Sequence, residues 1–282
     1  MTPADRRTAG QTPEHVTSVS NDTVKLLRSL DRKKAREESG LFLAEGARLI
    51  EEGLRHGWRP SVALAGLQAL ERPRTADLLG RLRTAGARTL TASEKVMSAV
   101  SRKDNPQTVI AAFHQRLSAL TELPTHGPRR WLALFEVRDP GNLGTILRTG
   151  DAAGVDGIVL IGDTCDPFSM EAVRASMGSI FAMPVARAGT DEFLKWKAAT
   201  GAQLTAASMR GRERHDQVRY RERTIVVLGN EQSGLPPTLE SECDELVRIP
   251  MSGAADSLNL ASAASVMIYE VWRSTGYEGA AP

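Results

Sequence analysis

Short apolar runs alternate with amphipathic stretches through the first half of the chain. Three apolar runs have the length of single buried strands, at 41–46, 61–66 and 108–113. Two amphipathic stretches end at a glycine, as helices often do, at 47–57 and 75–86. The spacing of Val24, Leu27 and Leu30 predicts a further short helix before them. This alternation predicts a small α/β domain over residues 21–120.

A second alternation follows after a gap in the pattern. Residues 121–130, "TELPTHGPRR", contain two prolines and a glycine and predict a linker. Beyond it, near-continuous apolar runs predict strands at 131–137, 157–162, 202–208, 224–229 and 245–250. The stretches between and after them predict helices at about 143–153, 169–180, 191–200 and 257–274. We therefore expect a parallel sheet covered on both faces over residues 131–282, and a flexible polar tail over residues 1–20.

Composition narrows the class of protein only slightly. No 18-residue window is wholly apolar, so we expect no membrane span. Two cysteines and five scattered histidines form no disulfide framework and no metal-ligand spacing, so we expect no metal and a reducing cytoplasm. Residues 1–125 carry 20 Lys/Arg and 14 Asp/Glu, whereas residues 126–282 carry 16 and 20. A basic first half beside an acidic second half fits a polyanion-binding module attached to a catalytic one, although ordinary solvated faces explain it equally well.

Three loops follow predicted strands and contain polar residues where open α/β sheets bind ligands. In "VRDPGNLGTILRTGDAAG" (137–154), we expect Asn142 to be the N-cap of a helix, and the stretch taken alone is explained by a surface pair of Arg148 with Asp151. In "VVLGNEQSGLPP" (226–237), Glu231 follows a strand directly. In "IPMSGAADSLNLASAASVMIYEVW" (249–272), Ser257 and Asn259 precede a helix. Each loop taken alone is also explained by capping and turn formation.

Taken together, the three loops resemble the signature motifs of a known family. "DPGNLGTILRT", "LGNEQSGLP" and "IPMSGAADSLNLASAASVMIYE" are similar, in order and spacing, to the three motifs of the SpoU (TrmH) branch of the SPOUT RNA methyltransferases. "VRASMGSIFAMPV" (173–185) resembles the segment between the first two motifs, and the resemblance covers residues 131–274. The first half, through "LFLAEGARLIEEGL" and "NPQTVIAAF", resembles the accessory RNA-binding domain that is built like ribosomal protein L30e.

The resemblance implies a fold, a cofactor and a set of site residues. It implies a deep trefoil knot in the C-terminal domain, a homodimer formed through that domain, and S-adenosylmethionine as methyl donor to a ribose 2′-hydroxyl of RNA. By motif position, the cofactor site would include Gly229, Ile249, Met251 and Leu258. By motif position, the catalytic group would be Asn142, Arg148, Glu231, Ser257 and Asn259. The extra N-terminal domain favours 23S ribosomal RNA as the substrate, with tRNA as the alternative.

The role of Arg148 can be argued from its chemistry. The family assigns this arginine the role of base, but a guanidinium has a pKa above about 12 and loses its proton only at large cost. We therefore expect Arg148 to bind the target phosphate and to stabilise charge on the 2′-oxygen, with Glu231 and Asn142 orienting it. The family usually has a small apolar residue where Asp151 stands and alanine where Thr145 stands, and Asp151 would compete for the guanidinium.

RNA contacts are expected mainly from the basic first half. The candidate residues form two clusters: Arg28, Arg32, Lys33, Lys34 and Arg36 in the first, and Arg102 and Lys103 in the second. A non-catalytic RNA-binding protein on the same scaffold is an alternative, but such a protein would be expected to lose some of the five polar positions. A resistance-conferring methyltransferase would share the chemistry and differ in target. A Rossmann dehydrogenase is disfavoured because no G-x-G-x-x-G follows a strand.

Overall fold

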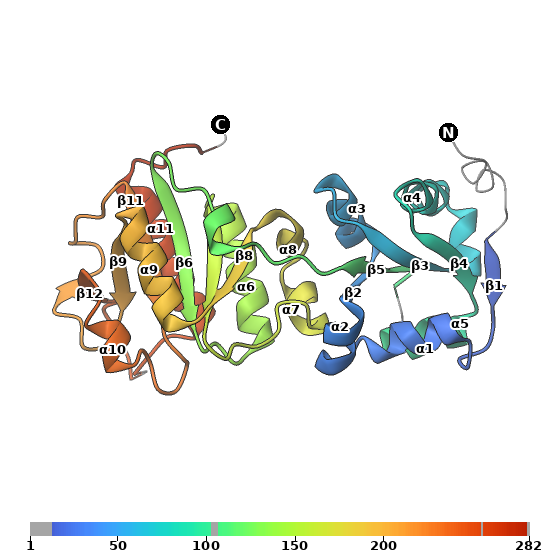
Figure 1. The fold of residues 1–282 in the computed structure, drawn as a ribbon, viewed down its shortest axis with the longest axis horizontal. Coiled ribbons are helices and arrows are strands. Elements are labelled where there is room, and N and C mark those ends of the chain that lie inside the picture. The colour runs from blue at the N-terminus through green and yellow to red at the C-terminus, as the bar shows by residue number, and fades with distance from the viewer. Residues whose placement is uncertain (1–12, 103–106, 255, 281–282) are drawn as a thin grey trace. The chain divides into compact units, whose positions relative to one another are not determined.

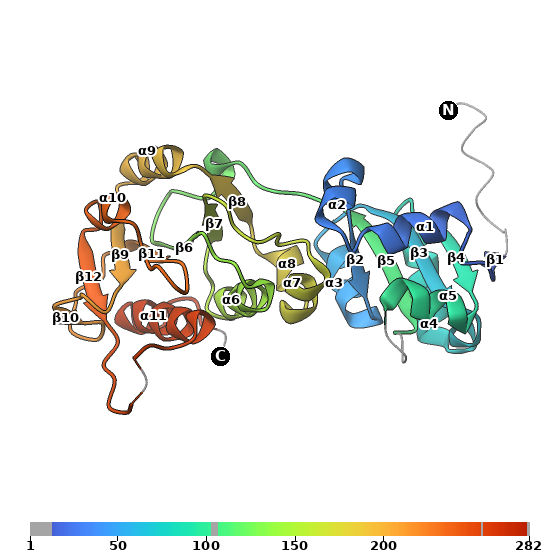
Figure 2. The same ribbon diagram turned by 90° about the horizontal axis from the view of Figure 1, so that it is seen from below.

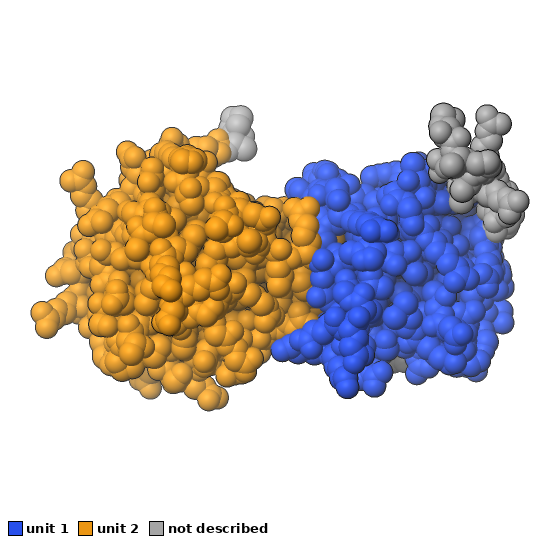
Figure 3. All heavy atoms as spheres, in the orientation of Figure 1, with its two compact units in different colours: residues 1–115 blue, residues 116–282 orange. Residues whose placement is uncertain are grey.

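The computed structural model describes residues 13–102, 107–254 and 256–280. The chain divides into two compact units, residues 1–115 and 116–282, which Figure 3 colours separately. Each unit contains one sheet with helices on both faces (Figures 1 and 2).

Unit 1 has a five-stranded mixed sheet in the order β1-β4-β3-β5-β2. Its strands are β1 (Glu14–Val16), β2 (Leu41–Glu45), β3 (Pro60–Gly66), β4 (Arg88–Ala92) and β5 (Val109–His114). Its helices are α1 (Asp22–Ser29), α2 (Lys33–Ser39), α3 (Ala47–Arg55), α4 (Pro73–Thr84) and α5 (Glu94–Ser101), with a 3-10 turn η2 (Leu67–Glu71). Helices α3 and α4 cover one face of the sheet, and α1 and α5 pack on the other (Figure 1). The expected small α/β domain is therefore present.

Three elements of unit 1 were not predicted. Residues Glu14–Val16, expected in the tail, pair with β4 in parallel as strand β1. Strand β4 ("RTLTA", five residues) and helix α5 ("EKVMSAVS", eight residues) were not predicted because both are short. The single helix expected around Leu30 is two helices, because the chain turns between α1 and α2 at residues 30–32.

Unit 2 has a seven-stranded sheet in the order β10-β12-β9-β11-β6-β7-β8, in which every strand pairing is parallel. Its strands are β6 (Arg129–Phe135), β7 (Gly157–Ile161), β8 (Val185–Ala188), β9 (Gln203–Ala207), β10 (Glu213–Arg214), β11 (Arg223–Leu228) and β12 (Glu245–Arg248). Its helices are α6 (Pro140–Ala152), α7 (Met170–Ala175), α8 (Ser179–Ala182), α9 (Thr190–Thr200), α10 (Pro237–Glu240) and α11 (Leu260–Ser274), with a 3-10 turn η3 (Leu120–Glu122). The central strands are buried on both faces, which confirms the expected parallel sheet.

The expected linker at 121–130 does not separate the units. The division falls between Gln115 and Arg116 instead. Leu120 and Leu123 belong to the core of unit 2, together with Trp131, Phe193 and Trp196. Burial of these two leucines ties the proline-containing segment to unit 2, a long-range packing effect that local periodicity does not report.

Helix α6 lies close to two other helices on one face of the sheet. A Cβ added at Gly144 would lie under 3.0 Å from the carbonyl oxygen of Ala172 and from the Cβ of Ala175, so α6 and α7 approach closely. On its other side α6 packs against α11, which also contacts β11 in the middle of the sheet. After β12 near one edge, the chain therefore returns to the centre of the sheet, while α9 covers the opposite face (Figure 2).

Among the described residues, no helix is long and apolar enough to cross a membrane.

Candidate active site

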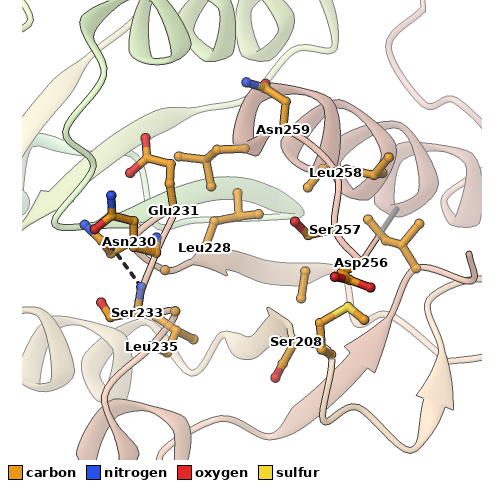
Figure 4. A pocket seen from close by; sticks show the side chains of 18 of the residues that line it. Ser208, Leu228, Asn230, Glu231, Ser233, Leu235, Asp256, Ser257, Leu258 and Asn259 are labelled. Carbon is orange, nitrogen blue, oxygen red and sulfur yellow. Dashed lines mark hydrogen bonds between the residues drawn. The ribbon is translucent and has the colours of Figure 1, made fainter. Parts of the chain in front are cut away.

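The loops that follow β9, β11 and β12 enclose a pocket of about 840 Å³ at the carboxyl edge of the unit 2 sheet (Figure 4). The four positions expected to contact a cofactor, Gly229, Ile249, Met251 and Leu258, all line this pocket. Three of the expected catalytic residues, Glu231, Ser257 and Asn259, line it as well. The structure thus brings the second and third sequence motifs together around one cavity.

The loop after β11 is built by Asn230, a residue that the sequence analysis did not single out. Its side-chain oxygen accepts hydrogen bonds from the backbone N–H groups of Gln232 (2.9 Å) and Ser233 (3.1 Å), and its Nδ2 donates to the carbonyl of Glu136 (2.8 Å). Backbone bonds between Asn230 and Gly234 close the turn. A turn held in this way presents the exposed Glu231 at the rim of the pocket.

Position 229 requires a glycine because the same loop folds back very close to it. A Cβ at this position would lie under 3.0 Å from the backbone of Gly234 and Leu235. Such a side chain would have to push the turn outward, and the turn forms one wall of the pocket. The glycine therefore fixes the shape of the cavity through a close backbone approach.

Three polar side chains from the three motifs form a hydrogen-bonded chain. Asn142 Nδ2 donates to Glu231 Oε1 (3.4 Å), and Asn259 Nδ2 donates to Asn142 Oδ1 (2.9 Å). Asn142 is thus both donor and acceptor, and it joins helix α6 to the two loops. The backbone N–H of Arg138 donates to the other oxygen of Glu231 (3.4 Å). These bonds hold the carboxylate at the rim on the side of α6.

One local prediction for the first motif is wrong. Helix α6 begins at Pro140, and its N-cap is Asp139, whose Oδ1 accepts from the N–H of Asn142 (2.7 Å). The Asp-Pro pair sets this start, because proline is favoured in the first helical turn. Asn142 therefore lies inside the helix, and its side chain is available for the contacts with Glu231 and Asn259. Asn259 itself caps α11 by accepting from Ala261 and Ser262.

Arg148 is exposed on α6, six residues after Asn142, which corresponds to about 9 Å along the helix axis. Within the described part of the chain, its guanidinium has no carboxylate within 4.0 Å. The alternative surface pair with Asp151 does not form, and Asp151 Oδ2 instead accepts a hydrogen bond from Ser179 Oγ (2.7 Å) at the start of α8. Asp151 thus joins α6 to α8 and leaves Arg148 free for a ligand.

Ser257 lies on the exposed segment that precedes α11 and lines the pocket (Figure 4). Its hydroxyl makes no hydrogen bond to any residue that the structure describes. The pocket is also lined by residues that sequence reasoning missed, namely Ser208, Met209, Arg210 and Asp256. The first three follow β9, so their place beyond a strand end is the one signal that could have found them.

A half-buried thiol, that of Cys165, lies near the site. Burial raises the pKa of Cys165 to about 12, and the charge of Glu231 adds to the increase. Burial likewise raises the pKa of Cys243, which lies elsewhere in the unit, to about 12. Neither thiol has the low pKa of a nucleophilic cysteine.

The basic residues expected to bind RNA in unit 1 fall into different environments. Arg28, Arg32, Lys33 and Lys34 are exposed, and the two lysines lie 3.8 Å from Glu37 and Glu38 respectively. Arg36 is buried, and its Nη1 donates to the carbonyls of Leu30 (2.9 Å) and Asp31 (2.7 Å), so its role is structural and its assignment to an RNA surface is wrong.

Of the second basic cluster, Arg102 and Lys103, the structure describes only Arg102. Arg102 pairs with Asp31 at 2.6 Å, so its charge is neutralised within unit 1. Lys103 lies outside the described residues. Among the described residues, no group of three or more His, Cys, Asp or Glu side chains is arranged to hold a metal ion.

The fold and the site together define the class of protein: an open parallel α/β domain with a ligand pocket beyond the carboxyl ends of its strands. Open parallel α/β sheets bind their ligands beyond the carboxyl ends of the strands, and such pockets are mostly apolar with a few fixed polar groups. Unit 2 has this arrangement, with a rim formed by residues of three separate loops.

Comparison with known proteins identifies the family within this class. The SpoU rRNA Methylase family matches residues 129–269, and the MRM3-like substrate binding domain matches residues 21–111. The chain belongs to the SpoU rRNA Methylase family, which confirms the family expected from the three motifs.

Three relatives illustrate the similarity. The 23S rRNA (guanosine(2553)-2′-O)-methyltransferase RlmP of Bacillus subtilis is 31% identical over 92% of this chain and 99% of its own. The 23S rRNA (uridine(2479)-2′-O)-methyltransferase of Streptomyces viridochromogenes is 30% identical over 86% of each chain. The crystal structure of an AdoMet-bound rRNA methyltransferase from Sinorhizobium meliloti matches with a TM-score of 0.87 and 42% identity, covering 92% of this chain and 97% of that one.

Proposed function

We propose that the chain transfers a methyl group from S-adenosylmethionine to a ribose 2′-hydroxyl of 23S ribosomal RNA. The observation that carries the proposal is the hydrogen-bonded chain of Asn142, Glu231 and Asn259 at the rim of the pocket. It unites residues from all three motifs of a family whose relatives include two 23S rRNA 2′-O-methyltransferases. A protein that only bound RNA would have no need of this polar group beside a small-molecule pocket.

The pocket fits S-adenosylmethionine in size and chemistry. Its volume of about 840 Å³ lies in the range of pockets that enclose small molecules of this size. Leu228, Ile249, Met251 and Leu258 supply apolar walls for an adenosyl group, and the backbone beside Gly229 can approach it closely. When bound, the cofactor supplies a methyl group on a sulfonium, which is already a good leaving group.

The task left to the protein is to position the hydroxyl and to favour its loss of a proton. We assign Arg148 the role of binding the target phosphate and stabilising the negative charge that develops on the 2′-oxygen. Its guanidinium is exposed and has no acidic partner among the described residues, so it is available for an anion. Glu231 and Asn142 orient the RNA side of the site, and Ser257 and Asn259 fix the loop before α11.

Three further properties belong to the same proposal. We expect unit 2 to form a homodimer, and the return of the chain from β12 to the centre of the sheet to form the trefoil knot of the family. The packing of α11 against α6 and β11 supports that return path. A cytoplasmic location follows from a ribosomal RNA substrate.

The decisive experiment maps 2′-O-methyl groups in total RNA from cells with and without the gene. The expected result is the loss of one site in 23S rRNA, restored by the wild-type gene but not by Glu231→Gln. A lost site in tRNA with rRNA unchanged would replace the substrate by tRNA. If no site were lost and calorimetry showed no heat with S-adenosylmethionine, the methyltransferase assignment would be wrong.

A further inference from the structure

The connection between β9 and β11 is unusually rich in arginine. Five of the fifteen residues 208–222 are arginines, against three acids, although residues 126–282 as a whole carry more acids than cations. The sequence motifs of the family do not include this segment, and neither the pocket nor the polar chain of the active site accounts for the enrichment.

The structure separates these arginines onto two opposite edges of the sheet. Arg219 and Arg221 lie at the amino edge, because both bond through their backbone to the side chain of Gln203, the first residue of β9 (3.4 and 2.9 Å). Residues 210–214 lie at the carboxyl edge instead. Arg210 lines the pocket, and Glu213–Arg214 pair with the end of β12 as strand β10.

At the carboxyl edge, three arginines come together from β12, β10 and the segment just before β10. Arg248 is the last residue of β12 and directly precedes Ile249 of the pocket, and its register partner in β10 is Arg214. Arg248 Nη1 donates to the carbonyl oxygen of Arg212 (3.1 Å), which places these two residues side by side. We call Arg212, Arg214 and Arg248 the edge cluster. It lies along the outer edge of the sheet formed by β10 and β12 (Figure 2).

Two charges of the edge cluster are not neutralised by the protein. Arg214 is paired with Asp216 at 2.6 Å, and the neighbouring Arg210 is paired with Glu240 at 2.6 Å. Arg212 and Arg248 are exposed, and neither has a carboxylate within 4.0 Å in the described part of the chain. The guanidinium of Arg248 lies against the backbone of Arg212, and the Arg212 side chain is itself exposed, so two unpaired cationic side chains extend from neighbouring segments of backbone. The arrangement is therefore suited to a polyanion.

Met209 extends the same surface toward the pocket. Its side chain is 66% exposed, although it is large and apolar, and the residue also lines the pocket. An exposed apolar side chain beside guanidinium groups matches a single-stranded nucleic acid, which offers phosphates together with unstacked base faces. In a duplex the base faces are stacked and are not available to such a side chain.

We propose that the edge cluster and Met209 bind the backbone of a single-stranded RNA segment that flanks the nucleotide in the active site. The inference rests on the proposed function and adds to it a substrate-binding surface in the methyltransferase unit itself. Phosphate contacts fix the register of a nucleic acid without reading its sequence. Arg248 directly precedes Ile249, which lines the pocket. The contacts of the edge cluster would therefore set the position of the target ribose along the RNA strand.

The test compares two double charge reversals in the full chain. Arg212→Glu/Arg248→Glu alters the edge cluster, and Arg219→Glu/Arg221→Glu makes the same change in charge at the opposite edge of the same sheet. The probe is a single-stranded oligouridine of about 16 nucleotides, and its Kd is measured between about 50 and 200 mM salt. Binding of S-adenosylmethionine, measured by calorimetry, verifies that each variant is folded. If the glutamate pair does not fold, the Arg212→Gln/Arg248→Gln pair replaces it.

The edge-cluster variant is expected to bind about tenfold more weakly at low salt, with the salt slope reduced by about 1.4 for two lost contacts. The opposite-edge variant is expected to change Kd less than about twofold, since only long-range charge is altered. Equal losses in both variants, or none in either, would overturn the proposal. The oligouridine comparison needs no methylation, so it remains decisive even if mapping in cells rejects the 23S rRNA assignment.

Discussion

At the scale of single residues, the site depends on which polar groups already have partners. Asn142, Glu231 and Asn259 satisfy one another, whereas Arg148 is left with an exposed guanidinium. Asp151, which departs from the family pattern, is occupied by Ser179 and does not compete for Arg148. The polar chain therefore provides a fixed frame, and Arg148 is the group that remains available to the substrate.

The role of Arg148 predicts the result of a conservative substitution. Arg148→Lys keeps the positive charge but loses the planar fork that can hold a phosphate and the 2′-oxygen together. Loss of one such donor commonly lowers turnover by about 100-fold, so we expect that reduction in kcat with unchanged binding of S-adenosylmethionine. Arg219→Lys, at the other edge of the sheet, is the matched control. Near-normal turnover of Arg148→Lys would disprove a two-pronged contact.

The raised pKa values of the two cysteines predict how the rate of their alkylation depends on pH. Because burial raises the pKa of Cys165 and Cys243 to about 12, few thiolates exist at neutral pH. In the native protein, the rate of alkylation by iodoacetamide should rise about tenfold per pH unit up to pH 11 or so. In denaturant the rate should level off near pH 9 to 10, as for a free thiol. A plateau at that pH in the native protein would show that the folded structure does not raise the pKa of these thiols.

At the scale of elements, close packing of helices determines where the motifs lie. Helix α6 carries the first motif and is held between α7 and α11. Its contact with α7 depends on Gly144, where no Cβ fits, and Thr149 Oγ1 lies 3.3 Å from Ser265 Oγ on α11. These contacts fix the helix that presents both Asn142 and Arg148.

A pair of glycine substitutions tests this packing. Gly144→Ala places a methyl group against the backbone of α7 and should lower the free energy of unfolding by about 1–3 kcal/mol. Gly80→Ala in α4 is the control, since nothing lies within 4 Å of its Cβ position, and it should stabilise by about 0.5–1 kcal/mol. Urea unfolding measures both. Equal effects of the two substitutions would contradict the close contact of α6 and α7.

At the scale of the whole molecule, the chain joins a small mixed α/β unit to a larger parallel α/β unit. The pocket belongs entirely to the second unit, and the matches to a substrate binding domain and to a methylase family fall on the first and second units respectively. The exposed basic residues proposed to bind RNA are likewise divided between the two units. Arg28 and Arg32 remain exposed in unit 1, and the edge cluster lies in unit 2.

Ligand binding should therefore stabilise one unit only. S-adenosylmethionine at about 100 times its Kd adds about 2.7 kcal/mol to the stability of the unit that binds it. Hydrogen exchange should slow most in residues 228–235 and 249–260, and residues 13–102 should be unaffected. Gly229→Ala, which pushes the pocket wall outward, should show no protection. Equal protection in both units would contradict a pocket confined to unit 2.

The sequence by itself determined the alternation of strands and helices, the parallel sheet of the second half, and the three motif loops, because these depend on local periodicity and on residue type. It misplaced the first residue of α6 and the boundary near 121–130, and it assigned Arg36 to the surface. The boundary is decided by long-range packing, because Leu120 lies in the core of unit 2. The start of α6 and the burial of Arg36 depend on particular local bonds that apolar periodicity does not report: the Asp139 cap, and the Arg36 bonds to the carbonyls of residues 30 and 31. Only the tertiary structure brought Asn142, Glu231 and Asn259 within hydrogen-bonding distance, because residues up to 117 positions apart meet only when strands β6, β11 and β12 lie in one sheet.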